Sequence, residues 1–443
     1  PPIDPASPHY NVLHLSDIHY DPLYKPGTRV DCGEPVCCRV GNGPPTDPSL
    51  AAGYWGDYRA CDTPLHLFEN MLQHIAATQD IDFVVYTGDT PVHAVWETSP
   101  ESNLDIMNVT TSLVRQYLPT ARFFGAIGNH EPSPVDLDPP PGTYTGPDGK
   151  NSMQWLYDGA SAIWGKDISE EARQSLRYAG YYSTRVDDGL IVVSLNMNFG
   201  DSNNWWLLID AEDPANQLQW LVDTLQQAEN DGDKVIVLGH QPGSSLMYSF
   251  STNFYNIVAR YESTILAQFY GHSHRDQFKI FLDEENIARG MSIAYVGGSV
   301  TTYSNLNPGY RLYKLDVPTK EVLDVSNYYF NLTKANLNPA QPEWMFEYDA
   351  RTAYGFSNPT ISPQDWADLT VEFYDNDKKF NDYEYYKEKS STVAVYGACT
   401  GGCRTGEICD IRSQKPDSKD IFCPELSDSE YFEYLMYQPE DLC

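Results

Sequence analysis

The sequence predicts an α/β fold, in which buried strands alternate with amphipathic helices. Short runs of β-branched and other apolar residues recur along the first three hundred residues, and longer segments with apolar spacing near 3.6 separate them. Runs of this kind are typical of strands that are buried on both faces of a helix-covered sheet. The chain of 443 residues is long enough for one large core or two smaller ones.

Each apolar run is predicted to be a strand. The predicted strands lie at 12–15, 83–86, 123–127, 190–195, 235–238, 266–270 and 293–296. Helices are predicted between them over 64–77, 103–118 and 215–228. Pro64 suits the first turn of its helix, and Asp213 suits the cap before Pro214. The Pro/Gly-rich stretches at 41–48 and 139–149 are predicted loops.

The composition shifts after about residue 340 toward Tyr, Asp, Glu and Lys, with short apolar spacings. We therefore expect a tail over 1–10, a main domain over 11–340 and a smaller, mostly helical C-terminal subdomain over 341–443 that disulfides stabilise. The first residues lack an initiator Met, a basic segment and an apolar segment, so a processed or trimmed end is expected there, not a signal peptide.

The charge of the chain limits its partners. With 62 acidic and 29 basic residues, the formal net charge is -33 at pH 7. Nucleic-acid binding depends on Lys and Arg to neutralise phosphates, so no nucleic-acid partner is expected. The acidic surface suits either work in acid, where carboxylates titrate, or simple solubility outside cells. No apolar run approaches the roughly 18 residues that span a bilayer, so a soluble protein without a transmembrane segment is predicted.

The cysteines indicate an oxidising compartment. They lie in two clusters, at Cys32, Cys37, Cys38 and Cys61 and at Cys399, Cys403, Cys409, Cys423 and Cys443. Structural zinc is an alternative, but neither cluster has a paired C-x₂-C spacing, and disulfides are favoured. Sequons at Asn108 and Asn331 predict glycosylation and also point to the secretory pathway. The odd count leaves one thiol over, for which Cys443 is the natural candidate.

Residue types that bind metals follow five of the predicted strands. The five segments are Ser16-Asp17-Ile18-His19, Thr87-Gly88-Asp89, Gly128-Asn129-His130-Glu131, Gly239-His240 and Gly271-His272-Ser273-His274. Because ligands collect at the carboxyl ends of strands in α/β sheets, we expect these side chains to converge in one crevice. Mixed oxygen and nitrogen ligands suit borderline divalent ions such as zinc, manganese or iron.

The order D-x-H, G-D, G-N-H-E, G-H and G-H-x-H resembles the calcineurin-like metallophosphoesterases at every segment. The resemblance implies a sandwich of two β-sheets flanked by helices and a centre of two divalent metal ions, with zinc as the expected metal. It implies His130 as a catalytic residue that stabilises the phosphate or protonates the leaving oxygen. The implied ligands are Asp17, His19 and His274 for one ion, Asn129, His240 and His272 for the other, and Asp89 for both.

Further stretches resemble the acid sphingomyelinase group of phosphodiesterases, from about residue 10 to the C terminus. These stretches are 31–39, 53–58, 88–96, 194–198, 257–262 and 306–311. The resemblance implies that His93 acts with His130 on the phosphate and leaving group. That group carries an N-terminal saposin-like domain, which helps to present lipid, and this sequence begins at the Pro-rich linker that follows it. One cysteine pair of the group's catalytic domain has no counterpart in this sequence. The implied disulfides are Cys32–Cys37, Cys38–Cys61, Cys399–Cys403 and Cys409–Cys423, with Cys443 left free.

The predicted function is that of a phospholipase C-type hydrolase, secreted or lysosomal and monomeric. It would release phosphocholine or a related headgroup phosphate from sphingomyelin or glycerophospholipids at a membrane or micelle surface. The stretch 203–208, with Trp205 and Trp206, is either a lip that touches the membrane or part of the core. One alternative is a phosphodiesterase of nucleotides or other small molecules. Another is a secreted binding protein on the same scaffold, which the complete set of ligand residues disfavours.

Overall fold

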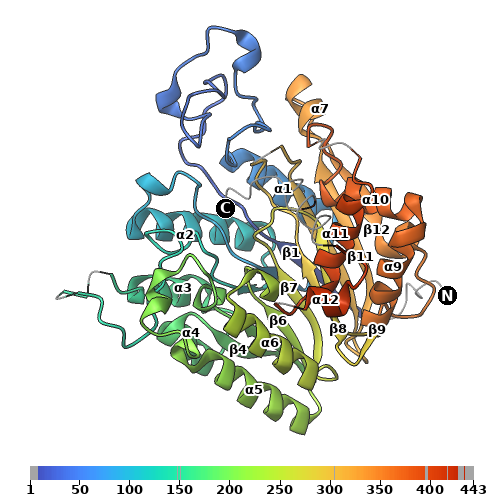
Figure 1. Ribbon diagram of the computed structural model, residues 1–443. Coiled ribbons are helices and arrows are strands. Elements are labelled where there is room, and N and C mark those ends of the chain that lie inside the picture. The colour runs from blue at the N-terminus through green and yellow to red at the C-terminus, as the bar shows by residue number, and fades with distance from the viewer. Residues whose placement is uncertain are drawn as a thin grey trace.

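The protein is a sandwich of two mixed β-sheets with helices on its outer faces (Figure 1). A computed structural model describes residues 8–146, 148–149, 151–303, 305–394, 398–416, 418–427 and 434. The predicted α/β class and the implied two-sheet sandwich are confirmed.

The first sheet carries the amino-terminal strand near its centre. Its strand order is β12 (Trp344–Asp349), β11 (Val322–Phe330), β10 (Gly309–Asp316), β1 (His9–Leu15), β2 (Phe83–Tyr86) and β3 (Arg122–Gly125). Strands β1, β2 and β3 are parallel, whereas β10 pairs with β1 in the antiparallel sense. The three parallel strands therefore end at one edge, and the segments with Asp17, Asp89 and Asn129 follow there.

The second sheet brings the remaining ligand segments to the same end of the molecule. Its strand order is β4 (Tyr182–Asp187), β5 (Leu190–Ser194), β6 (Lys234–Leu238), β7 (Ile265–Tyr270), β9 (Asn286–Val296) and β8 (Gln277–Asp283). Strands β5, β6, β7 and β9 are parallel, and β4 and β8 are antiparallel to their neighbours. His240 follows β6, and His272 and His274 follow β7.

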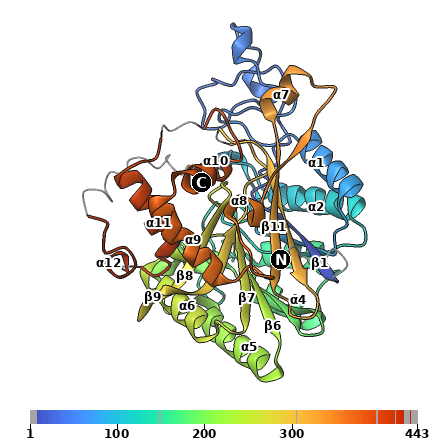
Figure 2. The ribbon, with the colours of Figure 1, turned by 90° about the vertical axis from the view of Figure 1, so that its right-hand side faces the viewer.

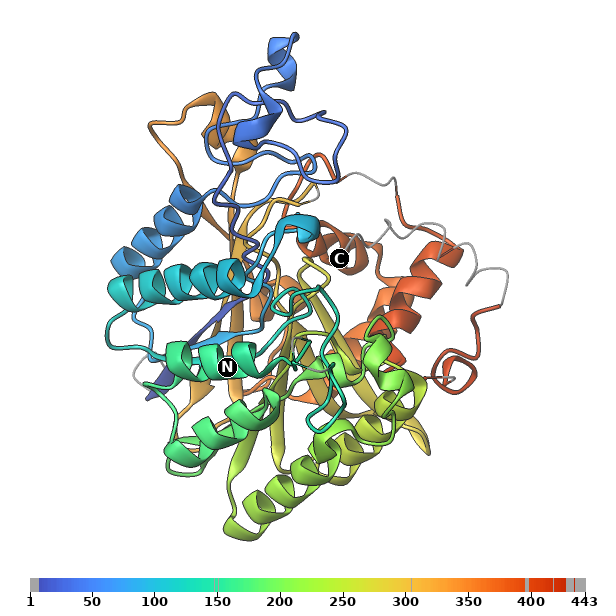
Figure 3. The ribbon, with the colours of Figure 1, turned by 90° about the vertical axis from the view of Figure 1, so that its left-hand side faces the viewer.

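Helices cover the sheets in two groups. The blue to light-green helices of Figure 3 lie along one side, and they are α1 (Leu65–Thr78), α2 (Pro100–Tyr117), α3 (Gln154–Trp164), α4 (Glu170–Ala179) and α5 (Gln217–Asp231). Helix α6 (Tyr248–Arg260) packs beside α5 and against β8 and β9. The later helices are α7 (Leu332–Leu337), α8 (Ala350–Tyr354), α9 (Pro363–Asp375), α10 (Asp377–Lys387), α11 (Gly402–Arg412) and α12 (Lys419–Phe422). On the other side, α9 contacts β9 and α11 contacts β8 (Figure 2).

All of the predicted strands and helices are present, with ends that differ by at most three residues, except that β9 begins at Asn286, well before the strand predicted at 293–296. Pro64 is the residue before α1 and not part of its first turn. Asp213 caps α5 from a distance, because its carboxylate accepts hydrogen bonds from the backbone N–H of Leu218 (2.7 Å) and of Gln219 (3.0 Å). Strands β4, β8 and β10–β12 were not predicted. Of these, β12 lies after residue 341 and completes the first sheet.

Aromatic rings fill the space between the two sheets. Phe269 on β7 is fully buried and meets the ring of Tyr313 on β10 edge-on, with centroids 4.7 Å apart. The ring of Tyr295 on β9 lies 5.8 Å from that of Phe269. At the other end of the sandwich, the Tyr182 hydroxyl donates to the carbonyl of Gly125 on β3 (3.0 Å). These contacts hold the two sheets, and hence the two sets of ligand segments, at a fixed separation.

We expect Phe269→Ala to lower the free energy of unfolding by about 3 to 5 kcal/mol, since it leaves a cavity between the sheets. Urea denaturation followed by circular dichroism measures this change. Leu337→Ala is the control, because Leu337 is 83% exposed on α7 and its loss should change stability by no more than about 0.5 kcal/mol. Equal stability of the two variants would show that this ring does not join the sheets.

Candidate metal centre

The seven predicted ligands converge between the two sheets, and three of them form a first cluster. His274 Nε2 lies 3.6 Å from Asp17 Oδ1, and His19 Nε2 lies 4.0 Å from the same oxygen. The two imidazole Nε2 atoms are 3.2 Å apart. All three side chains are buried. Segments that follow β1 and β7, one from each sheet, thus supply one set of donor atoms.

The second cluster lies next to the first and is joined to it by Asp89. His240 Nε2 is 3.1 Å from Asp89 Oδ2, and His19 Nε2 is 3.6 Å from the same oxygen. His272 Nδ1 lies 3.2 Å from Asn129 Oδ1. Asp89, His240 and His272 group their ligand atoms closely enough to hold one ion. The structure therefore brings together all seven predicted ligands, with Asp89 between the two sets.

The backbone is bent sharply at five of these residues. Non-glycine residues rarely adopt positive φ, and such strain concentrates at functional sites. A sharp turn directly after a strand directs successive side chains into the space between the sheets. The residues and their φ values are Asp17 (49°), His19 (41°), Asp89 (61°), His272 (72°) and His274 (60°).

Backbone carbonyls orient three of the imidazoles. His19 Nδ1 lies 2.7 Å from the carbonyl of Pro91, His240 Nδ1 lies 2.7 Å from that of Thr87, and His274 Nδ1 lies 2.6 Å from that of Tyr303. A carbonyl only accepts hydrogen bonds, so each Nδ1 carries a hydrogen and donates it. In the neutral rings, Nε2 then carries the lone pair that a metal ligand needs.

These donor atoms fit divalent cations. Burial lowers the pKa of His19 and of His274 well below the usual value, so both rings are neutral, and their Nε2 lone pairs face each other at 3.2 Å beside the Asp17 carboxylate. Burial raises the pKa of Asp17 to about 7. Such a concentration of buried lone pairs and carboxylates is unfavourable without a positive charge among them.

The second cluster also requires a positive charge among its buried side chains. Asp89 Oδ2 and His240 Nε2 are buried, and neither has a hydrogen-bond partner elsewhere in the described residues. Burial lowers the pKa of His240, but the Asp89 carboxylate outweighs burial and raises it to about 10. A proton thus supplies the positive charge here, and a divalent cation would displace that proton.

Glu131 supports the centre although it is not a predicted ligand. Its carboxylate accepts hydrogen bonds from the backbone N–H of Gly128 (2.7 Å), of Asp89 (3.0 Å) and of Thr90 (2.7 Å). It therefore ties the segment after β2 to the segment after β3. The G-N-H-E motif contained this residue, but only the structure shows which backbone groups it binds.

His93 and His130 lie beside the first cluster. The His93 ring stacks on that of His19 (3.7 Å) and on that of Tyr303 (4.2 Å), and its centroid is 4.9 Å from that of His130. Burial lowers the pKa of His130 to about 4. Its Nδ1 is buried without a hydrogen-bond partner within the described ranges. The structure thus brings both predicted catalytic histidines to the centre.

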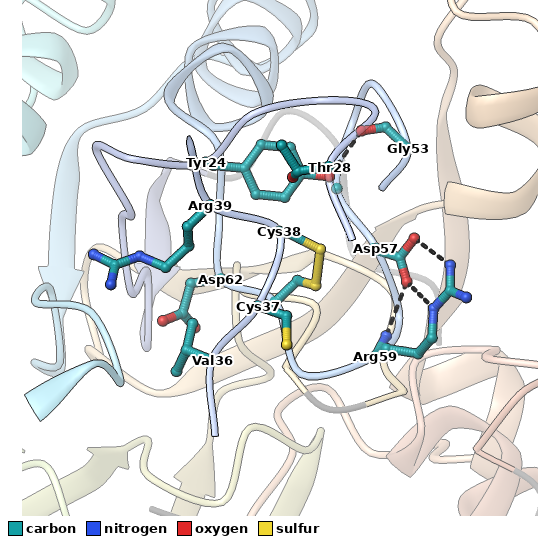
Figure 4. The surroundings of a disulfide bond; sticks show 12 residues. Tyr24, Thr28, Val36, Cys37, Cys38, Arg39, Gly53, Asp57, Arg59 and Asp62 are labelled. Atoms are coloured by element: carbon teal, nitrogen blue, oxygen red, sulfur yellow. Dashed lines mark hydrogen bonds and ion pairs between the residues drawn. A yellow bond between two sulfur atoms is a disulfide. The ribbon is translucent and has the colours of Figure 1, made fainter. Parts of the chain in front are cut away.

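Sequence reasoning missed Asp62, which holds His93. Asp62 Oδ1 lies 2.6 Å from His93 Nδ1, and Oδ2 accepts from the His93 backbone N–H (2.8 Å). Asp62 directly follows Cys61, which is bonded to Cys38, so this disulfide fixes the segment that carries the carboxylate (Figure 4). The position beside a cysteine was the only signal in the sequence.

The other predicted features are placed as follows. Asn108 is exposed on α2 and Asn331 caps α7, and their glycosylation stays a prediction. Cys443 lies outside the described residues. No described helix is long and apolar enough to cross a membrane. The structure contains the disulfides Cys32–Cys37, Cys38–Cys61, Cys399–Cys403 and Cys409–Cys423, which are the four implied pairs.

Comparison with known families agrees with this fold and centre. Residues 10–276 match the calcineurin-like phosphoesterases, so the chain belongs to that family. More narrowly, residues 292–420 match the acid sphingomyelin phosphodiesterase C-terminal region. Strands β2 to β7, all of β1 except its first residue, and all of the predicted ligands lie within the first match.

Three relatives illustrate the range of the family. Sphingomyelin phosphodiesterase of Homo sapiens is 40% identical and covers 92% of this chain, which spans 64% of that protein. Sphingomyelin phosphodiesterase 1 of Caenorhabditis elegans is 35% identical over an alignment that covers 94% of this chain and 72% of the relative. The cyclic GMP-AMP phosphodiesterase SMPDL3A of Rattus norvegicus is 31% identical over an alignment that covers 90% of this chain and 88% of the relative.

We expect Gly128→Ala to weaken metal binding by about 10- to 100-fold. An added Cβ would collide with Asp89 Oδ1 and lie 2.9 Å from Glu131 Oε2, which displaces the carboxylate that joins the two clusters. Zinc affinity, measured by competition with a chelator, checks this. Gly41→Ala is the control, because nothing lies within 4 Å of its added Cβ. Two ions bound to Gly128→Ala as tightly as to the control would contradict the assignment.

Proposed function

We propose that the protein is a two-metal phosphodiesterase of phospholipase C type, which hydrolyses sphingomyelin or choline glycerophospholipids and releases phosphocholine. The observation that carries the proposal is the pair of His19 and His274 lone pairs, directed at each other beside two buried carboxylates. The relatives named sphingomyelin phosphodiesterases support the substrate class. The disulfides support a secreted or lysosomal location, and we propose a monomer.

In this proposal the metal ions are zinc. Asp89 would bind both, and when bound they would polarise the phosphate oxygens and lower the pKa of a bound water. The imidazole nitrogens and the buried carboxylates suit zinc, which accepts nitrogen and oxygen ligands. The first ion would be held by Asp17, His19 and His274, and the second by Asn129, His240 and His272.

His93 and His130 would act on the phosphate and the leaving oxygen. Because the Asp62 carboxylate accepts from His93 Nδ1, Nε2 is the atom at which His93 would hold or transfer a proton. The backbone N–H of His130 donates to Asp89 Oδ1 (2.9 Å), which keeps that ring next to the shared carboxylate. Proton transfer to the leaving alcohol would require the protonated form of one of these imidazoles, since a neutral ring is too weak an acid, and the two hydrogen bonds orient the rings for that step.

An apolar lip beside the centre favours a lipid substrate. Trp205 is 74% exposed, Leu208 90% and Ile209 71%, in and directly after the short helix Trp205–Leu208. The base of the lip is rigid, since the buried Asn204 donates to the carbonyl of Asn198 (2.9 Å). Asn198 in turn donates to the carbonyl of Gly128 (3.1 Å), in a segment of the metal centre. Exposed aromatic and aliphatic groups of this kind enter lipid interfaces.

A nucleotide phosphodiesterase is the second candidate. It is favoured by the similarity to the cyclic GMP-AMP phosphodiesterase, of which the chain covers 88%. The same two-metal chemistry applies to both substrate classes, because each presents a phosphodiester. The two substrate classes differ in the protein surface that they require, because a dissolved nucleotide can be bound without an apolar lip.

Incubation of the zinc-loaded protein with sphingomyelin vesicles, phosphatidylcholine vesicles and ATP in parallel tests the function. We expect phosphocholine together with ceramide or diacylglycerol. Release of AMP alone would show that the protein is a nucleotide phosphodiesterase instead. Two bound ions without hydrolysis of any of the three would select a non-catalytic binding protein.

The lip separates the candidates further. We expect a variant with Trp205, Leu208 and Ile209 each changed to Ser to hydrolyse vesicles at least about 10-fold more slowly, with unchanged turnover of a soluble chromogenic phosphodiester. Val371→Ser, at a 54% exposed position on α9, is the control and should leave both rates unchanged. Unchanged vesicle hydrolysis by the triple variant would exclude a role for the lip.

Asp89→Ala and His130→Ala form a pair that separates metal binding from proton transfer. We expect Asp89→Ala to abolish turnover and to lose bound zinc, with the fold kept by its disulfides. We expect His130→Ala to lower turnover by roughly 100-fold or more with zinc content unchanged. Turnover assays and metal analysis on the same samples check both. Full activity of Asp89→Ala would refute the two-metal assignment, and zinc loss in His130→Ala would make His130 a ligand.

A further inference from the structure

His14 is a buried histidine that neither metal binding nor proton transfer uses. It lies on β1 between the two sheets, is 2% exposed and meets the ring of Phe269 edge-on, with centroids 5.6 Å apart. A polar ring among apolar side chains is unfavourable unless both nitrogens are hydrogen-bonded. His14 Nδ1 lies 3.2 Å from the Tyr313 hydroxyl, and Nε2 lies 3.0 Å from Thr87 Oγ1.

From Thr87 the hydrogen bonds continue to a metal ligand. Thr87 Oγ1 donates to Ser16 Oγ (2.7 Å), and Ser16 Oγ donates to Asp17 Oδ2. Thr87, Ser16 and Asp17 are all fully buried. The second carboxylate oxygen, Asp17 Oδ1, is the one nearest to the imidazoles of His19 and His274.

In the other direction the hydrogen bonds end at a buried cation. The Tyr313 hydroxyl accepts from Arg311 Nη1 (3.4 Å). Arg311 is 3% exposed and forms an ion pair with Asp276, which also accepts from the Tyr348 hydroxyl (2.8 Å). An unbroken chain of hydrogen bonds therefore runs from Arg311 to Asp17 through the apolar interior, and His14 is its middle link.

The donor and acceptor capacities of these groups fix the direction of every hydrogen bond between Arg311 and Asp17. A guanidinium can only donate and an ionised carboxylate can only accept, while each hydroxyl has a single hydrogen. Ser16 uses its hydrogen on Asp17 and Thr87 uses its own on Ser16, so His14 Nε2 must donate to Thr87. His14 Nδ1 then accepts from Tyr313. This neutral tautomer agrees with the pKa of His14, which burial lowers well below the usual value.

We propose that His14 is a positioning residue of the metal centre, which links Arg311 to Asp17 so that aligned hydrogen-bond dipoles stabilise the Asp17 carboxylate and present its Oδ1 to the first ion. The proposal rests on the two-metal centre proposed above. Every donor in the chain faces toward Asp17, and aligned hydrogen bonds in a dry interior strengthen one another. Outer hydrogen-bond partners of metal ligands orient those ligands in the same way.

The zinc affinity of the whole 443-residue protein tests the proposal. We expect His14→Phe, which keeps the ring shape but breaks the chain, to weaken binding of one of the two ions by about 10- to 100-fold and to leave the other unchanged. His14→Gln, which can both donate and accept, should restore most of that affinity. Thr87→Val removes one hydroxyl and little volume, and should weaken the same ion even if His14→Phe fails to fold.

The controls distinguish a positioning role from mere filling of the interior. His74→Phe, on α1, should leave both affinities unchanged. If His14→Phe and His14→Gln lose zinc affinity equally, while Thr87→Val keeps the wild-type affinity, His14 only fills space and the inference is overturned. Unchanged affinity for both ions in His14→Phe and Thr87→Val would overturn it as well. A wild-type protein that binds fewer than two ions would instead overturn the proposed function, and this inference with it.

Discussion

The buried carboxylate of Asp89 is the point on which the centre depends. It lies between two clusters of imidazoles, it is completely buried, and its Oδ2 is within 3.6 Å of one ring nitrogen from each cluster. A carboxylate in such a place requires positive charge around it. The sharp turns after the strands, the close glycine at residue 128 and the hydrogen bonds that Glu131 accepts all hold that carboxylate in this position.

Support for the centre comes from segments that are far apart in the chain. The first disulfide-rich segment carries Asp62 and so orients His93. The turn after α10 contributes Lys389, whose Nζ donates to the carbonyl of Ser299 (2.9 Å). The backbone N–H of Ser299 donates to the carbonyl of His274 (3.0 Å). The two family matches are therefore joined at the metal centre itself, and the later one is more than a cover for the second sheet.

The net charge of -33 has the opposite sign to the charge that the centre needs. The acidic surface disfavours anionic partners at neutral pH, whereas two divalent ions would make the buried site attractive to one phosphodiester. In the proposed function, the exposed lip at Trp205 would add an apolar contact that does not depend on charge. Selection of a substrate would then combine a repulsive surface, a local cationic site and this lip.

The α/β class, the predicted strands and the ligand segments could all be derived from the sequence, because periodicity and motifs act over a few neighbouring residues. In contrast, the position of β10 against β1 and of β12 at the edge of the first sheet became apparent only in the folded protein. It alone showed that Asp62 holds His93 and that His14 meets Tyr313, 299 residues away in the chain. A hydrogen bond between residues far apart in the chain leaves no local sequence pattern, and its direction can be assigned only when every partner is in place.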